Sequence, residues 1–138
     1  MRKRYYIVIA CCVLLLSGIA WALYWYKKPH RNVAGLKPEF KIDARELYGE
    51  YKKDEAIADR KFAGKVVEVK GTIASEQLTH STADIQLSTG DAEASVSCNF
   101  LVRGSAKFNF PSRGAAVTIK GRCTGYLQDV NLVDCVIE

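Results

Sequence analysis

The most regular pattern in the chain is an apolar run near the N-terminus. Residues 5–26 carry no formal charge and lie between two basic clusters, Arg2-Lys3-Arg4 and Lys27-Lys28. With a helical rise of about 1.5 Å per residue, the run would be about 33 Å long, enough to cross a hydrocarbon core of about 30 Å. The pattern therefore predicts an N-terminal tail and single transmembrane helix over residues 1–26.

Two other interpretations of this run stay open. A cleaved signal peptide would have its cleavage pattern at Ala20-Trp21-Ala22, and Cys11 follows Val8-Ile9-Ala10 as in a lipoprotein signal, although few apolar residues precede it. Aromatic residues stand at both ends of the run, as in the interfacial belts of a retained helix: Tyr5, Tyr6, Trp21, Tyr24, Trp25 and Tyr26. We therefore favour a retained anchor.

The pattern changes after the anchor. Proline and glycine interrupt any regular period over residues 27–41, which predicts a juxtamembrane linker. Residues 42–138 have periodic apolar positions and are long enough for one small domain with a single core. The domain is therefore expected to begin at about residue 42.

Helix signals open this domain. Asp43 and Glu46 have the spacing of a capping box, and apolar residues then recur at helical spacing, which predicts a helix over residues 44–53. Asp54 can cap a second short helix that ends at Ala63-Gly64. The helical aromatic residues are expected to cover one end or face of the following sheet: Tyr48, Tyr51 and Phe62.

From residue 65 the period becomes alternating, as in strands with one buried face. Five strands are expected, at residues 65–73, around 85–87, and at 94–100, 117–123 and 130–137. Gly71 suggests a bulge in the first strand, and residues 76–82 are expected to be a loop. Five short strands with a longer third connection favour a closed Greek-key barrel of OB type. An open five-stranded α+β sheet with both helices on one face is the alternative.

The charge distribution depends on the anchor. Six of the 20 basic residues and none of the 15 acidic residues lie in residues 1–35, so the remaining chain has 14 basic against 15 acidic residues. The basic residues next to the anchor are therefore expected to meet anionic lipid head groups: Lys27, Lys28 and Arg31. We expect the N-terminus in the cytoplasm and the C-terminal domain in the periplasm of a single-pass inner-membrane protein, although the basic residues flanking the run are nearly balanced.

Two stretches resemble the tRNA_anti-like family. They are residues 64–71, GKVVEVKG, and residues 120–127, KGRCTGYL, which precede LVDC at 132–135. The resemblance covers most of residues 42–137 and is most specific in CTGYL and the cysteine that follows it. It implies a bacterial envelope-associated OB domain, similar to the anticodon-binding domain of aminoacyl-tRNA synthetases, and it implies a fold rather than a ligand.

Neither nucleic-acid binding nor catalysis has a clear sequence signal. Single strands of nucleic acid bind OB domains through aromatic and basic side chains on the outer face of the second and third strands. Here that face would carry neither kind, because its residues are Asp84, Gln86, Ser88, Ser95, Ser97 and Asn99. His30 and His80 lie outside any hydrolase or metal motif. We therefore expect no catalytic residues, metal or cofactor.

Three cysteines of the domain, Cys98, Cys123 and Cys135, are too far apart in sequence for a zinc motif. They permit three single disulfides, each of which leaves one thiol. In an OB barrel the last strand runs beside both strands that carry the other two cysteines. We prefer Cys123 with Cys135, with three buried free thiols as the alternative.

OB barrels usually bind oligomers at two loops. Here these are residues 76–82, with Gln77, Thr79 and His80, and residues 125–129, with Tyr126 and Gln128. Both loops are small and polar, which suits a glycan, a peptide or an envelope protein. The sequence therefore favours a membrane-anchored binding or assembly module of the bacterial cell envelope, with single-stranded nucleic-acid binding as the alternative.

Overall fold

The computed structural model describes residues 2–26, 32–102 and 109–138. The chain separates into two compact units, Met1–His30 and Arg31–Glu138. The first unit consists of α1 (Arg2–Tyr26), which is long and apolar enough between Tyr5 and Trp25 to cross a membrane. A signal sequence would have the same length and composition.

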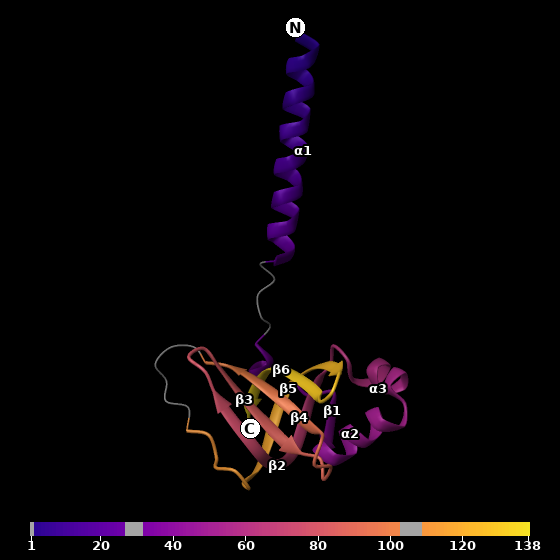
Figure 1. The fold of residues 1–138 in the computed structure, drawn as a ribbon, viewed down its shortest axis with the longest axis vertical. Coiled ribbons are helices and arrows are strands. Elements are labelled where there is room, and N and C mark those ends of the chain that lie inside the picture. Colours follow the sequence, from indigo (N-terminus) through magenta and orange to yellow (C-terminus); the bar gives the residue numbers. More distant parts are fainter. Residues whose placement is uncertain (1, 27–31, 103–108) are drawn as a thin grey trace. The chain divides into compact units, whose positions relative to one another are not determined.

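The second unit is mainly β structure with two short α-helices (Figure 1). Its elements are η1 (Val33–Gly35), β1 (Phe40–Asp43), α2 (Ala44–Lys53), α3 (Glu55–Phe62), β2 (Val66–Leu78), β3 (Thr82–Ser88), β4 (Ser95–Leu101), β5 (Ala116–Tyr126) and β6 (Val130–Ile137).

Five of the strands close into a barrel in the order β2-β3-β4-β6-β5. Neighbouring strands are antiparallel except β4 and β6, which run parallel. The pairing of β2 with β5 joins the two ends of the sheet, so the open α+β sheet is excluded. The predicted OB-type barrel is confirmed, and closure removes the edges that an open sheet would expose.

The strand β2 is longer than the sequence indicated. Its residues Glu76, Gln77 and Leu78 pair with β3, so the expected loop at 76–82 shrinks to a tight turn. The bulge is also displaced, because the β2–β3 register shifts between Ile73 and Ser75 and not at Gly71. Gly71 instead allows α2 to approach, since a Cβ there would lie 3.0 Å from the Cβ of Ala44.

Part of the expected linker is folded. Within residues 27–41, η1 and the first half of β1 pack on the barrel, and β1 pairs in parallel with β2. Val33 is 1% exposed, and Lys120 Nζ donates a hydrogen bond to the Ala34 carbonyl at 3.2 Å. The residues expected to meet lipid, Lys27, Lys28 and Arg31, lie outside the described residues, as does His30.

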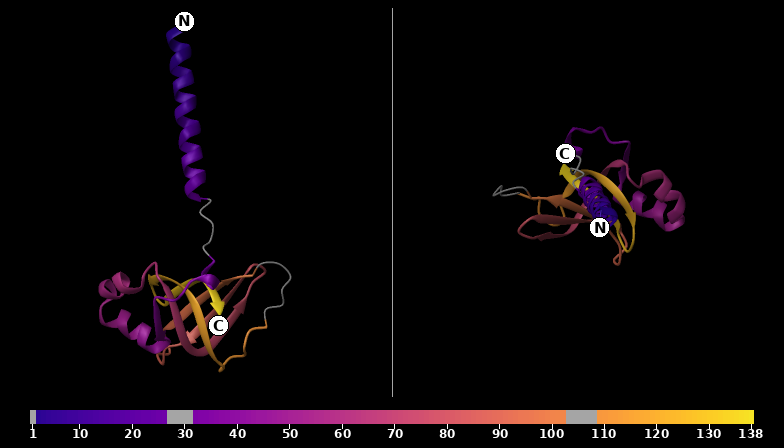
Figure 2. Two further views of the ribbon diagram at one scale, coloured as in Figure 1. Left: turned by 180° about the vertical axis from the view of Figure 1, so that it is seen from behind. Right: turned by 90° about the horizontal axis from the view of Figure 1, so that it is seen from above.

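The two helices form as their caps and apolar spacing predict. The side chain of Asp43 accepts a hydrogen bond from Arg45 N at 2.9 Å, and that of Asp54 accepts one from Ile57 N at 3.0 Å. Helices α2 and α3 lie together at one side of the barrel (Figure 2). Their buried side chains join the core of the barrel: Leu47, Tyr51, Ala58 and Phe62. The half-buried Tyr48 remains at the edge of this packing.

Candidate binding site at the β5–β6 turn

The two predicted binding loops lie at opposite ends of β3 and β4. The β2–β3 turn, residues 79–81, bonds to the end of β4 through Val102 N and Ser81 O. The β5–β6 turn, residues 127–129, instead bonds to the start of β4 through Ser95. Each of these strands has seven residues, so the turns are about 20 Å apart. The structure therefore does not bring the two predicted groups together.

The β2–β3 turn is exposed. Gln77, Thr79 and His80 are all exposed, and Thr79 N donates to Thr82 O at 2.8 Å to close the turn. None of these residues lines either of the clefts described below. The candidate site is therefore built around the other predicted pair, Tyr126 and Gln128.

The β5–β6 turn is held in place by Asp129. Its carboxylate accepts hydrogen bonds from the backbone N of Ser95 at 2.7 Å and from the Ser95 hydroxyl at 3.0 Å. Its carbonyl accepts one from the side chain of Asn131 at 3.0 Å. These bonds hold the backbone of the turn that carries Tyr126 and Gln128 in one conformation.

A cleft of about 800 Å³ opens between this turn and α2. We call it the helix-side cleft. Its lining combines two tyrosines with charged, amide and apolar side chains: Tyr48, Lys52, Asp91, Glu93, Ala94, Tyr126, Leu127 and Gln128. Three separate parts of the chain, α2, the β3–β4 turn and the β5–β6 turn, thus supply one surface.

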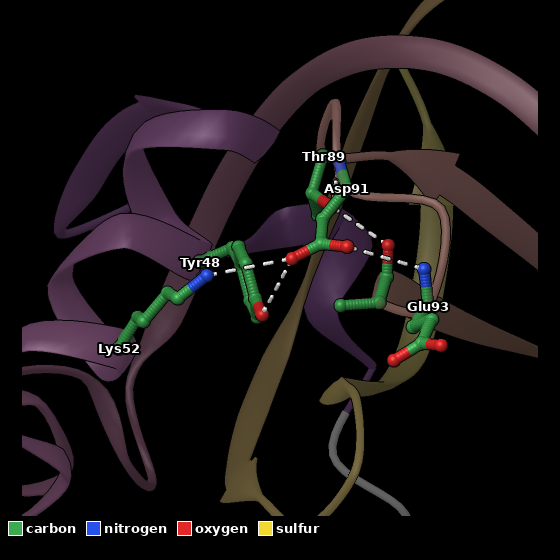
Figure 3. A network of polar contacts seen from close by, with 6 residues as sticks. Tyr48, Lys52, Thr89, Asp91 and Glu93 are labelled. Atoms are coloured by element: carbon green, nitrogen blue, oxygen red, sulfur yellow. Dashed lines mark hydrogen bonds and ion pairs between the residues drawn. The ribbon is translucent and has the colours of Figure 1, made fainter.

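Asp91 organises one wall of the helix-side cleft (Figure 3). Its Oδ2 atom accepts from the Tyr48 hydroxyl and lies near Lys52 Nζ, both at 3.4 Å, while Oδ1 accepts from Glu93 N at 3.3 Å. The Glu93 amide, together with Lys52, holds the pKa of Asp91 below its usual range. Partial desolvation raises the pKa of Tyr48. At neutral pH the wall therefore presents a carboxylate and a neutral phenol.

A second cleft, of about 590 Å³, lies on the barrel side of the same turn. We call it the barrel-side cleft. Hydroxyl, amide and carboxyl side chains from α3 and the barrel strands line it: Asp59, Asp84, Ser97, Asn99, Thr124 and Asn131. Gly125, at φ +110°, makes room for Asp59, because a Cβ there would lie 3.1 Å from Asp59 Oδ1. This cleft is acidic and rich in hydrogen-bonding groups.

Tyr126 and Leu127 line both clefts. The Tyr126 ring stacks on Tyr51 with centroids 5.8 Å apart and also contacts Tyr48 at 6.2 Å. Tyr51 is buried, and its hydroxyl lies 3.3 Å from the Cys123 sulfur, so the ring beneath Tyr126 is fixed. Burial raises the pKa of Tyr51 well above its usual range, which keeps the phenol neutral. Leu127 is 89% exposed on the rim between the clefts.

The outer face of β3 and β4 has the expected polar character. Its side chains bond to neighbours on the barrel, with Ser97 donating to Asp84 at 2.9 Å and Ser75 donating to Gln86 at 2.7 Å. Acidic residues outnumber basic ones along the clefts, where Lys52 is the basic side chain among the lining residues. Among the residues described, no three His, Cys, Asp or Glu side chains are placed to hold a metal ion.

The three cysteines of the barrel lie in different surroundings, and the preferred Cys123–Cys135 pair stays a prediction. All three cysteines of the barrel are buried free thiols in this structure. Cys123 contacts the Tyr51 hydroxyl, whereas the Cys135 sulfur lies close to Gly121.

Sequence reasoning missed half of the site. Tyr48 was expected to be a packing residue, and no expectation was attached to Lys52 or Asp91. Tyr48 and Asp91 are 43 positions apart, so periodicity along α2 could not reveal their contact. The one local signal was the position of Tyr48 beside the apolar stripe of Leu47 and Tyr51, at the boundary between core and solvent.

The closed barrel defines an OB-type domain that follows an apolar N-terminal helix. The chain belongs to the tRNA_anti-like family, whose profile matches residues 1–137. No match was found among curated proteins.

Two solved structures are similar in fold. One, from Klebsiella pneumoniae subsp. pneumoniae MGH 78578, is described as a putative nucleic acid-binding lipoprotein. The TM-score is 0.58 and the identity 18%, over 80% of this chain and 99% of that one. The other is described as a putative aspartyl-tRNA synthetase from Leishmania major Friedlin. It has a TM-score of 0.47 and 14% identity over 76% of this chain and 21% of that one, too weak a likeness to support an argument.

Proposed function

We propose that this protein is a membrane-anchored binding module of the bacterial cell envelope, without catalytic activity, whose barrel binds a glycan at the β5–β6 turn. The observation that carries the proposal is the pair of clefts that share Tyr126. An aromatic ring flanked by amide, hydroxyl and carboxylate groups can contact the apolar face of a sugar and bond to its hydroxyls. OB folds bind oligosaccharides as well as oligonucleotides.

The proposed location rests on the anchor and on charge. The apolar helix α1 has aromatic residues at both ends, which favours retention in the inner membrane. Basic residues gather in and around α1, so the barrel itself has no excess of positive charge. The proposed orientation places the N-terminus in the cytoplasm and the barrel in the periplasm, where glycan strands are available.

Nucleic-acid binding is the second candidate, because the Klebsiella structure of similar fold is described as putatively nucleic acid-binding. The similarity of that structure to this chain shows only that the two share a fold. Binding to a phosphate backbone depends on lysine and arginine side chains. A nucleic acid bound in the clefts would bring its phosphates close to the carboxylates of Asp59, Asp84 and Asp91. Among the lining residues, Lys52 is the side chain that could offset this negative charge. These charges favour a neutral ligand over a polyanion.

A binding titration of the full chain in detergent micelles separates the two candidates. We would titrate it with a tetramer of β-1,4-linked N-acetylglucosamine and with a single-stranded RNA oligonucleotide at low salt. The tetramer should bind, and Tyr126→Ala should weaken its affinity by about tenfold or more because the stacking surface is lost. His80→Ala, in the other predicted loop, is the matched control and should change nothing.

The opposite pattern would overturn the proposal. Salt-sensitive RNA binding without binding of the tetramer would favour the nucleic-acid candidate. Equal effects of Tyr126→Ala and His80→Ala on the affinity for the tetramer would remove the β5–β6 turn from the site.

A further inference from the structure

A pair of polar side chains lies side by side in the barrel-side cleft. Asp84 in β3 and Asn99 in β4 are directly opposite each other in the antiparallel register. Both are half-buried and line the cleft. Residues placed in this way on one face of a sheet have Cβ atoms about 5 Å apart. The cleft therefore presents a carboxylate next to a carboxamide.

The carboxylate of this pair is oriented by a neighbour. Ser97, two residues before Asn99 in β4, donates a hydrogen bond from its hydroxyl to Asp84 Oδ1 at 2.9 Å. The two oxygens of a carboxylate can together accept about four hydrogen bonds. Asp84 can therefore accept a further bond from a donor of a ligand in the cleft.

The carboxamide of Asn99 is available to a ligand. Within residues 32–102 and 109–138, no group is hydrogen-bonded to it. Its side chain offers two N–H donors and a carbonyl acceptor. The other asparagine of the cleft is engaged in the turn, because Asn131 Nδ2 donates to Asp129 O at 3.0 Å. Asn99 is thus the amide that can donate into the cleft.

Apolar side chains adjoin the polar pair. Leu127, Leu132 and Val133 also line the cleft. Leu132 is 1% exposed and lies opposite Cys98 in the β4–β6 register. The next residues of these two strands, Val133 and Asn99, therefore lie on the outer side of the sheet. Val133 is half-buried and supplies apolar surface on the face that carries Asn99.

These three surfaces match the three parts of an acetamido group. Its N–H is a donor for Asp84, its carbonyl is an acceptor for the amide of Asn99, and its methyl group is apolar like Val133. A sugar with a hydroxyl at the same position has no methyl group and no carbonyl. Such a sugar would leave the Asn99 amide unpaired beneath it, which costs affinity.

We propose that the barrel-side cleft recognises the N-acetyl group of an amino sugar, with Asp84 accepting from its N–H, Asn99 donating to its carbonyl and Val133 covering its methyl group. This inference rests on the proposed glycan binding and adds the substrate class, an N-acetylated glycan. Peptides carry amide groups as well. Tyr126 lines the same cleft and provides a surface for a sugar ring, which favours the sugar.

A matched pair of oligosaccharides tests this proposal on the full chain in detergent micelles. The tetramers of β-1,4-linked N-acetylglucosamine and of β-1,4-linked glucose share a backbone and differ in the acetamido groups. Calorimetric titration should give an affinity about tenfold higher for the N-acetylated tetramer. Asn99→Ala and Asp84→Ala should each lower this preference severalfold. Gln86→Ala is the control on the same face of β3, outside the lining of both clefts, and should leave the preference unchanged.

The possible failures are distinguishable. Equal affinities for the two tetramers, or an unchanged preference in both cleft variants, would overturn the N-acetyl assignment and leave the proposed glycan binding intact. Absence of binding to either tetramer would overturn both. Binding of tetraalanine as tight as that of the N-acetylated tetramer would assign the cleft to peptide amides instead. Because Asn99 and Asp84 lie on different strands, a variant that fails to fold leaves the other as the test.

Discussion

At Gly121 the barrel has room for a hydrogen atom and nothing larger. In Gly121→Ala the new Cβ would meet Cys135 Sγ at 2.6 Å and Leu132 Cβ at 3.2 Å. We predict that this variant is destabilised by about 1–3 kcal/mol, as is typical of overpacked cores, in urea unfolding of the full chain in micelles. Cys135→Ala should recover part of the loss in the double variant, because it shortens the clashing side chain.

Gly49 is the matched control for this substitution. It lies in α2, and a Cβ there would have no atom within 4 Å. Gly49→Ala should stabilise the protein by up to about 1 kcal/mol, since alanine is the better helix former. Equal stability of Gly121→Ala and Gly49→Ala would contradict the close packing of Cys135 on Gly121.

The contacts of Asp91 predict a response to acid. Its pKa is lower in the folded protein than in the unfolded chain, where it is about 3.9. A depressed carboxyl pKa contributes stability that is present above the unfolded pKa and is lost as pH falls through the folded pKa. We predict that Tyr48 and Lys52 separate from Asp91 as pH falls below about 4, with ring shifts of Tyr48 in NMR spectra as the measurement.

Asp91→Asn is the control for this titration. The variant keeps the shape of the side chain and has no carboxylate to protonate, so the acid transition at Tyr48 should be absent. A transition of Tyr48 that persists unchanged in Asp91→Asn would show that another group controls it.

Among the elements, η1 depends on one buried charge. Lys120 is 8% exposed in its side chain, donates to Ala34 O and forms an ion pair with Glu138. Lys120→Met should change overall stability by less than about 1 kcal/mol, since the partner Glu138 is 44% exposed and its carboxylate stays solvated after the substitution. It should nevertheless release η1, seen as faster hydrogen exchange of Leu36 N–H, which donates to Val33 O at 3.0 Å.

Lys53→Met is the control for the η1 prediction. Lys53 is exposed in α2 and pairs with Glu50 at 3.7 Å, so it belongs to an element other than β5 and η1. Its replacement should leave the exchange of Leu36 N–H unchanged. Unaltered exchange in Lys120→Met would show that other contacts of Val33 are enough to hold η1.

Elements with strong local signals could be predicted from the sequence. Asp43 and Asp54 mark both helix starts, and alternation marks the inner residues of the strands. The short β1 could not be predicted, because its four residues form a strand only through their pairing with β2. The end of β2 at Glu76–Leu78 is exposed on both faces, so it carries no alternating pattern.

At the scale of the whole molecule, the barrel brings together residues that the sequence keeps apart. OB-type closure was predictable from strand number and turn positions, and it placed the two expected loops at opposite ends of β3 and β4. The place of Tyr126 and Gln128 in the candidate site was predictable, because they lie in a loop at which OB barrels usually bind ligands. The place of Lys52 and Asp91 was not predictable, because it depends on how α2 packs against the barrel.

The charge of the whole chain is likewise divided between its parts. The net +5 comes from the N-terminal region, while the clefts are acidic. A basic overall composition is therefore poor evidence for a nucleic-acid partner in this protein. It agrees better with an anchor near anionic lipid and a barrel that binds a neutral ligand.

Photo-crosslinking in the native membrane tests the central claim most directly. A photoreactive amino acid would replace Leu127, which is 89% exposed between the two clefts, and in a matched chain it would replace His80. We predict an adduct at position 127 that a glycosidase removes and a nuclease does not, and none at position 80. A nuclease-sensitive adduct at position 127, or equal adducts at both positions, would contradict the account.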